Sequence, residues 1–524
     1  MMERHDIIII GSGVNSLIAA AILGKKGKKV LVLEARKEIG GLASTVEFAP
    51  GFHCNIIHDT IKWFDPRVLR ELEIESKGLD IIDIAIKRIA LGLNKNDYIV
   101  FHKDPIITSE SISKYSPEDA YKWIEFTKHV DDLSKFLEQL YQLTPPELPN
   151  IGLMDALSMR SLLKPILKQG TQGLVNLART APMMMPELMD EWFGNKLLRS
   201  AISTAGTNGL SYGPYASATG YNFLHQHLFS NGIIHNASVI KGGTFYIAKT
   251  LKKLLDSYNV ELRTNTKVTS INVKKNIYES VSIDSGDIIS SDKVISGLDP
   301  NNTFINLVGP QNLDPSFYTQ IKNIKYRGST ARIHFAINEL PDIEGINSDY
   351  MDTMFSICPS MEYIEKASDA AKYGFISNEP YIEFAIPTVL NPELSPDGKH
   401  VLSASVQYAP YHLRDCEWDS ESKEKLRQNT IQVLEKKIPH FSKLIEKTVV
   451  YSPKDFENEF GMTEGNLNHG EMTLDQILFM RPTASSSQYS TPFKNLYLCG
   501  PGTHPGGGLH GMNGYNAVKK VLES

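Results

Sequence analysis

The chain has 524 residues, of which 41% are hydrophobic and 22% are charged, and its formal net charge is −6. A chain of this length is too long for one compact core, so two or three domains are expected. The charges form no long single-sign blocks, which excludes the strongly basic composition typical of nucleic-acid-binding proteins. We therefore expect no nucleic-acid partner.

The cysteine pattern bears on the redox compartment. The four cysteines are far apart and form neither a metal-ligand spacing nor the paired framework of a secreted protein, so we expect no metal site and a cytoplasmic location. The first strand is expected to begin within about five residues of the N-terminus, which leaves no room for a signal peptide before it. No apolar run approaches the ~18 residues that span a bilayer, so any membrane contact is expected to be peripheral.

Residues 6–33 predict one βαβ unit, with strands over 6–10 and 29–33 and a helix over about 14–25. The first strand runs directly into a glycine turn, and a helix N-terminus after such a turn binds the pyrophosphate of a dinucleotide. Ser16 stands where a third glycine is customary, and we expect its small hydroxymethyl group to be tolerated. The predicted phosphate-binding residues are Gly11, Ser12, Gly13, Val14, Asn15 and Ser16.

An acidic residue and a second glycine pair follow the second strand. Glu34 stands at the strand's end, where a carboxylate accepts hydrogen bonds from a ribose diol and repels a 2′-phosphate. Paired glycines let the chain pass close beneath a long ligand, and Arg36 can donate to its ribose or phosphate. FAD and NAD both fit these features. The residues predicted to line this part of the site are Glu34, Ala35, Arg36, Gly40, Gly41, Leu42, Ala43 and Ser44.

The rest of the chain alternates between two styles of structure. Residues 115–235 are predicted to be mainly helical, and the α/β pattern returns near residue 242 with a helix followed by several strands. Residues 305–480 mix strands with one long helix. The last thirty residues repeat the order of strand, glycine turn and helix. One domain is therefore expected to be built from three separated segments, with a second domain inserted in two pieces.

The C-terminal segment GPGTHPGGGLHG lies between a predicted strand and the closing helix. So many glycines next to a helix start place backbone N–H groups against something flat or charged. A loop of this kind would be costly to order without a ligand. We therefore expect Gly500, His504, Gly511 and Met512 to contribute to the same cofactor site.

These motifs resemble the amine oxidase and phytoene desaturase superfamily of flavoproteins. The segment from Glu34 to Ser44 resembles its second conserved element, and GPGTHPGGGLHG resembles its C-terminal flavin-binding signature. Residues 241–271, 292–304 and 465–482 are also similar, with Val268 matching the residue whose backbone contacts adenine. The resemblance covers most of the chain and is closest to phytoene desaturase relatives named for disulfide chemistry, although the chain supplies no cysteine pair for such chemistry.

The resemblance implies FAD as cofactor and an α/β fold in which a Rossmann-like FAD-binding domain, built from discontinuous segments, carries an inserted α+β substrate domain. The expected FAD-binding segments are 1–80, 236–304 and 481–524. The expected substrate domain consists of a mainly helical part, 81–235, and an α+β part, 305–480.

The resemblance also implies an FAD-dependent oxidoreductase that oxidises or desaturates a hydrophobic small molecule, isoprenoid-like or lipid, by hydride transfer to flavin N5. Oxygen or a quinone would reoxidise the flavin. A flavin-dependent isomerase, an amine oxidase and a flavin-binding regulatory protein without turnover remain open. An NAD-linked dehydrogenase would need a second nucleotide unit, which the sequence does not show.

The sequence singles out no catalytic residue. His504 matches a histidine-proline pair of the family, and the other weak candidates are His58 with Asp59 and His469 with Glu471. The oligomeric state is open as well. Methionine side chains fit irregular apolar shapes, so those near residue 185 suggest either a substrate tunnel, a membrane patch or an ordinary helix core; they are Met183, Met184, Met185 and Met189, beside Leu188, Trp192 and Phe193.

Overall fold

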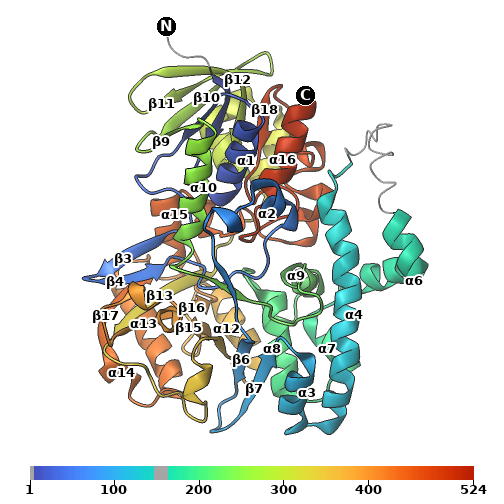
Figure 1. Cartoon of the computed structure of the whole chain (residues 1–524), viewed down its shortest axis with the longest axis vertical. Helices are drawn as coiled ribbons and strands as arrows, with labels where there is room; N and C mark the ends of the chain where they lie inside the picture. The colour runs from blue at the N-terminus through green and yellow to red at the C-terminus, as the bar shows by residue number, and fades with distance from the viewer. Residues whose placement is uncertain (1–4, 147–162) are drawn as a thin grey trace.

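The computed structural model describes residues 5–146 and 163–524. A first sheet with its helices forms the upper part of the molecule, a second sheet lies at the lower left, and a helical layer lies at the lower right (Figure 1). The described part begins and ends in the upper part, because both β1 and the closing helix α16 belong to the first sheet's layers.

The first sheet combines strands from three separated parts of the chain. In spatial order its strands are β10 (Val268–Lys274), β11 (Ile277–Ile283), β12 (Ile288–Ser296), β1 (His5–Ile10), β2 (Val30–Leu33) and β9 (Glu261–Arg263), and β18 (Leu496–Leu498) also pairs with β12. The pairings among β18, β12, β1, β2 and β9 are parallel, as in a Rossmann-like fold. The predicted α/β fold with a discontinuous Rossmann-like domain is confirmed.

The four isoleucines of β1 explain why this strand is central. Ile7 and Ile9 pack among helices on one face, and Ile8 and Ile10 are buried on the other face. A parallel strand covered on both faces has this near-continuous apolar sequence. The helices on the first face are α1 (Val14–Lys25), α2 (Pro66–Leu72), α10 (Phe245–Ser257) and α16 (Met512–Glu523), and α11 (Pro315–Asn323) covers the second.

The second sheet is mixed, with one apolar and one polar face. Its order is β17 (Ile445–Tyr451), β13 (Thr330–Ile337), β16 (His400–Gln407), β15 (Tyr381–Ala385), β14 (Met354–Ile357), β6 (Ile86–Leu91) and β7 (Tyr98–His102). Alternate side chains such as Ile333, Phe384 and Phe355 form an apolar core with α13 (Ser420–Glu435). The alternate positions on the opposite face are largely polar.

The helical layer packs beside the second sheet. Its helices are α3 (Pro105–Ser113), α4 (Pro117–Gln142), α6 (Leu163–Thr180), α7 (Met185–Trp192), α8 (Lys196–Thr207) and α9 (Thr219–Gln226). Residues 147–162 of the predicted helical stretch lie outside the described residues. Met185 and Met189 are buried in this layer's core with Leu188, so these methionines belong to a helix core.

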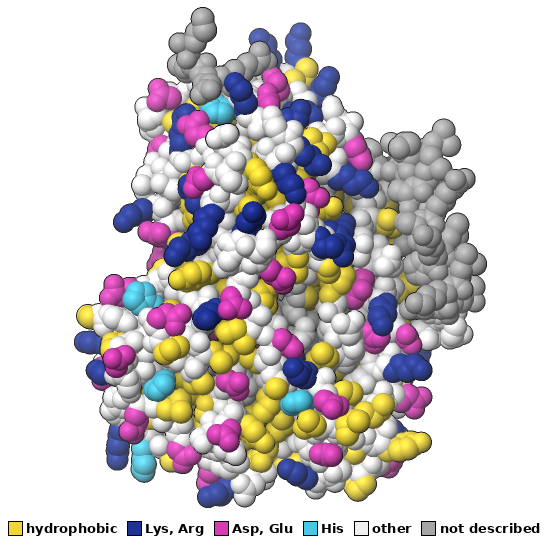
Figure 2. Space-filling model, in the orientation of Figure 1, with side chains coloured by type: hydrophobic (Ala, Val, Ile, Leu, Met, Phe, Trp, Pro, Cys, Tyr) yellow, Lys and Arg dark blue, Asp and Glu magenta, His cyan; other side chains and the backbone are white. Residues whose placement is uncertain are grey.

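The remaining elements connect these layers. They are β3 (Thr45–Ala49), β4 (Phe52–Asn55), β5 (Ile81–Asp83), β8 (Ser238–Ile240), α12 (Met361–Lys372), α14 (Phe441–Leu444) and α15 (Pro453–Phe460). Within the described ranges, no helix has the length and apolar character needed to cross a bilayer. The domain boundaries stay predictions, and β6 and β7 of the mainly helical segment 81–235 join the second sheet. Lysines, arginines and carboxylates are intermixed on the face that Figure 2 shows.

Ser16 fits its place because the residue opposite it is a glycine. Its side chain lies against Gly297, directly after β12, where an added Cβ would be 2.0 Å from Ser16 Oγ. The hydroxyl also lies 3.7 Å from Cys499 Sγ. The close contact between the first helix and its sheet is therefore kept by a glycine on the strand side.

We expect Gly297→Ala to destabilise the apoprotein by about 1–3 kcal/mol, because its methyl group would overlap the Ser16 hydroxyl. Adding Ser16→Ala should recover part of this loss, since the Ile10 carbonyl still lies 3.0 Å from the new Cβ. Urea unfolding of the two single variants and the double variant measures the coupling. Strictly additive effects would contradict the proposed contact.

Candidate functional site

One cavity of about 850 Å³ connects the glycine turns of both chain ends. It begins at the carboxyl ends of β1 and β2 and reaches the polar face of the second sheet. The cavity brings together most of the predicted cofactor residues, namely Gly11, Ser12, Gly13, Val14, Asn15, Ser16, Glu34, Ala35, Arg36, Gly40, Gly41, Leu42, Ala43, Val268 and Gly511. Four predicted residues do not line it, namely Ser44, Gly500, His504 and Met512.

The first end of the cavity offers groups that suit a nucleoside. The Glu34 carboxylate accepts hydrogen bonds from the Ser12 N–H at 2.7 Å and from the Arg36 N–H at 2.9 Å. The Arg36 guanidinium lies 4.1 Å from the centre of the Phe460 ring, and its Nη1 has no hydrogen-bond partner in the part of the chain that the structure describes. A buried donor without a partner is costly, so a ligand that accepts from it fits here.

The N-terminus of α1 points into open space. Gly13 is its N-cap residue, with φ −59° and ψ 160°, and no side chain caps the helix. A Cβ added at Gly13 would meet no atom within 4 Å. Free N–H groups and a positive dipole end beside empty space fit a pyrophosphate.

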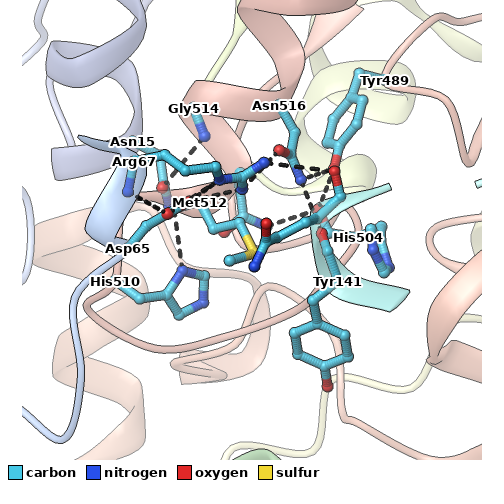
Figure 3. Close-up of polar contacts among 12 residues, drawn as sticks. Asn15, Asp65, Arg67, Tyr141, Tyr489, His504, His510, Met512, Gly514 and Asn516 are labelled. Atoms are coloured by element: carbon cyan, nitrogen blue, oxygen red, sulfur yellow. Dashed lines mark hydrogen bonds and ion pairs between the residues drawn. The ribbon is translucent and has the colours of Figure 1, made fainter. Parts of the chain in front are cut away.

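The N-terminus of α16 lies against that of α1. Gly511 caps α16 with φ 76°, again without a side-chain cap. A Cβ at Gly514 would be 2.1 Å from the Asn15 carbonyl oxygen, so only glycine allows this approach. Two helix starts from opposite ends of the chain therefore meet at one side of the cavity (Figure 3).

A hydrogen-bond network holds the C-terminal glycine loop behind the cavity wall (Figure 3). Tyr489 donates its hydroxyl to the His504 carbonyl at 2.8 Å, and the Asn513 amide donates to the same carbonyl at 3.3 Å. The Asp65 N–H donates to the His510 carbonyl at 2.9 Å. His504 thus contributes its backbone to this network, and its ring lies edge-on to Tyr141 at 5.4 Å.

His510 is the histidine of this loop that lines the cavity. Its ring stacks on Trp63, with centroids 4.2 Å apart and planes 2° apart. Burial lowers the pKa of His510 to about 3, so the ring is neutral near pH 7. Sequence reasoning missed both residues, although an aromatic residue shortly after the double glycine and a second histidine within the loop were available signals.

Two ion pairs lie on the polar face of the second sheet. Arg332 on β13 pairs with Asp59, and Arg88 on β6 pairs with Glu383 on β15. The strand register explains their proximity, because Arg332 and Glu383 both lie opposite Ser405 of β16. The sequence could not reveal these pairs, since their members are 273 and 295 positions apart.

The other predicted polar candidates fall into two groups. His58 and His469 line the cavity, and both are neutral near pH 7 because burial lowers each pKa to about 4. Glu471 does not line it: its carboxylate accepts from the Ser211 N–H at 2.7 Å and pairs with Arg327. Glu471 therefore joins two loops outside the cavity.

Disulfide and metal chemistry find no support. All four cysteines are free, and burial raises the pKa of Cys358 and of Cys499 to about 12, which keeps both thiols protonated. Over residues 5–146 and 163–524, no three His, Cys, Asp or Glu side chains gather in a way that could hold a metal ion.

Comparisons with known proteins agree with this geometry. A family model described as NAD(P)-binding Rossmann-like domain matches residues 9–70, and one described as flavin containing amine oxidoreductase matches residues 198–519. The chain is 28% identical to pyridine nucleotide-disulfide oxidoreductase domain-containing protein 2 of Rattus norvegicus, over 100% of this chain and 94% of that protein.

Two further relatives are a limonene dehydrogenase component of Castellaniella defragrans, 23% identical over 100% of this chain and 95% of that protein, and phytoene desaturase of Fusarium fujikuroi, 23% identical over 97% and 87%. Among solved structures, an oxidoreductase from Methanosarcina mazei has a TM-score of 0.63 at 15% identity and covers 99% of this chain and 100% of its own. A triple mutant of putrescine oxidase has a TM-score of 0.61 at 13% identity and covers 99% and 98%.

The Rossmann-like sheet and the two converging helix starts define a flavoprotein-type dinucleotide site. Because the second family model matches more than half of the chain, the chain belongs to the flavin-containing amine oxidoreductase family. The protein is an FAD-dependent oxidoreductase, and the expected relationship to phytoene desaturases is confirmed. The free helix N-terminus at Gly13 and the unpartnered Arg36 donor fit FAD. When bound, the flavin accepts two electrons from a substrate.

We expect Gly13→Ala to weaken FAD binding by about tenfold or more while leaving apoprotein stability within about 0.5 kcal/mol. The new methyl group meets no protein atom but fills the space beside the helix start. The matched control is Gly194→Ala, whose Cβ also has room and lies outside the cavity. Fluorescence titration of the apoprotein with FAD compares the two. Equal FAD affinity in both variants would contradict the assignment.

Proposed function

We propose that the protein catalyses the two-electron oxidation or desaturation of a mainly hydrophobic small molecule. The observation that carries the proposal is the continuity of the cavity, which joins the dinucleotide end to a chamber against the second sheet. Apolar side chains from several elements line part of this path, among them Ile57, Ile61, Met354, Leu467 and Leu509. The names of two relatives, limonene dehydrogenase and phytoene desaturase, support a hydrocarbon-rich substrate.

The residues of this chain position the substrate and exclude water. The stacked pair of Trp63 and His510 supplies a flat, uncharged wall, and the hydrogen bond between His225 Nε2 and the Gly507 carbonyl at 2.8 Å holds the glycine loop in place. Oxidation removes a hydride and a proton from the substrate and leaves a new double bond. Neutral His58 in the cavity is a candidate acceptor for the proton.

The electrons must leave the protein for turnover to continue. Oxygen, which would be reduced to hydrogen peroxide, or a quinone, which would be reduced to a quinol, is the proposed acceptor. The cytoplasmic location and the peripheral membrane contact remain predictions from the sequence.

We expect the purified protein to be yellow and to lose its flavin absorption when mixed anaerobically with an oxidisable terpene or lipid. Absorption should return when air or a soluble quinone is admitted, and the product should be two hydrogens lighter by mass spectrometry. The Gly13→Ala variant, with reduced FAD content, serves as the matched control. A product of unchanged mass formed with the flavin still oxidised would indicate isomerisation and contradict the proposed oxidation.

A further inference from the structure

The chamber against the second sheet contains more positive than negative charges. Arg88, Arg332 and Lys62 line it together with the two carboxylates of Asp59 and Glu383. Each arginine has its own carboxylate partner. Lys62 is therefore the cation that these two ion pairs leave uncompensated.

Lys62 lies in the segment that precedes Trp63, and its ammonium donates to Gln226 Oε1 at 2.5 Å. No carboxylate in the described ranges, 5–146 and 163–524, lies within ion-pairing distance of this ammonium. The amide of Gln226 is neutral and cannot balance the charge. Two further donors of the chamber, Nε of Arg88 and Nε of Arg332, also lack a hydrogen-bond partner among the described residues.

Protonation does not cancel the excess. Burial raises the pKa of Asp59 although Arg332 lowers it, and protonation of Asp59 would only make the chamber more positive. Burial also acts to raise the pKa of Glu383, but Arg88 and Lys62 outweigh that effect and the pKa is lowered. The neighbouring histidines carry no charge near pH 7, because burial lowers the pKa of each; they are His58, His225, His227 and His235.

An uncompensated buried cation is unfavourable unless an anion joins it. The paired arginines and the apolar path toward Trp63 leave one small anionic group as the complement. We propose that this chamber binds the carboxylate end of an amphipathic substrate, with Lys62 as its charge partner. The inference rests on the proposed function and narrows its substrate class. It disfavours a substrate that enters as an ammonium ion, since three cations line the chamber.

The test measures binding of three probes that share one alkyl chain, octanoate, octanol and octylammonium, to the FAD-loaded protein by calorimetry. A change in the flavin absorption bands reports that a probe occupies this cavity. We expect octanoate to bind about tenfold or more tightly than octanol, and octylammonium to bind more weakly than octanol. Equal affinity for octanoate and octanol, or preference for octylammonium, would overturn the inference.

Two substitutions at Lys62 and one elsewhere provide matched controls. Lys62→Met should remove the octanoate advantage and leave octanol binding unchanged, whereas Lys62→Arg should retain most of it. Lys252→Met, which removes an exposed lysine paired with Asp256, should change neither. If Lys62→Met leaves octanoate affinity unchanged while weakening sulfite addition to the flavin, Lys62 serves the flavin and the inference fails. FAD content and air reoxidation, measured on the same samples, test the proposed function separately.

The pH dependence gives an independent readout. Burial lowers the pKa of Lys62 to about 8, while the facing Glu383 carboxylate raises it and Arg88 lowers it. The ammonium is present below this value and is lost above it, and octanoate stays ionised throughout. We therefore expect octanoate affinity to fall by up to tenfold per pH unit above about pH 8 in the native protein, with no such fall in Lys62→Met. A flat profile between pH 7 and pH 10 would contradict the role of Lys62.

Discussion

The structure depends on the contact between the N-termini of two helices from opposite ends of the chain. Helix α1 begins after the first strand and α16 closes the chain, yet the Asn15 carbonyl and Gly514 are so close that a Cβ cannot fit between them. This contact requires that the chain return to the first sheet after both insertions. The β12 strand provides the bridge, because it pairs with β1 on one side and with β18 on the other. Two sets of free N–H groups then face one ligand.

The second sheet has the complementary task of closing the cavity. Its apolar face forms a core with α13, which frees the other face to carry polar side chains without loss of folding stability from that core. Buried charges are tolerated there because each arginine has a carboxylate partner on another strand or loop. The combination of a rigid sheet and fixed ion pairs gives a preorganised chamber, in which one remaining cation can distinguish between ligands by charge.

Sequence reasoning was strongest where a local pattern carries the physical requirement. The glycine turn at Gly11 and Gly13, the acid at the end of β2 and the glycine-rich loop each reflect a close backbone approach, so the cofactor end of the cavity was predictable. The substrate end was not, because its residues come from strands β6, β13 and β15, and no local pattern relates Arg88 to Glu383. The histidine of the C-terminal loop illustrates the same limit. Spacing favoured His504, but loop curvature places the ring of His510 in the cavity wall.

The replacement of the third fingerprint glycine by Ser16 shows how a local departure can be compensated at a distance. A glycine is customary there because the helix must lie close to its strand. In this chain the space is supplied by Gly297, which follows β12 some 280 residues later in the chain but lies directly against the serine side chain. The constraint therefore applies to the pair of positions, since either residue can be larger when the other has no side chain. A fingerprint read along one segment misses this exchange, whereas the parallel pairing of β1 and β12 makes it a local property of the folded sheet.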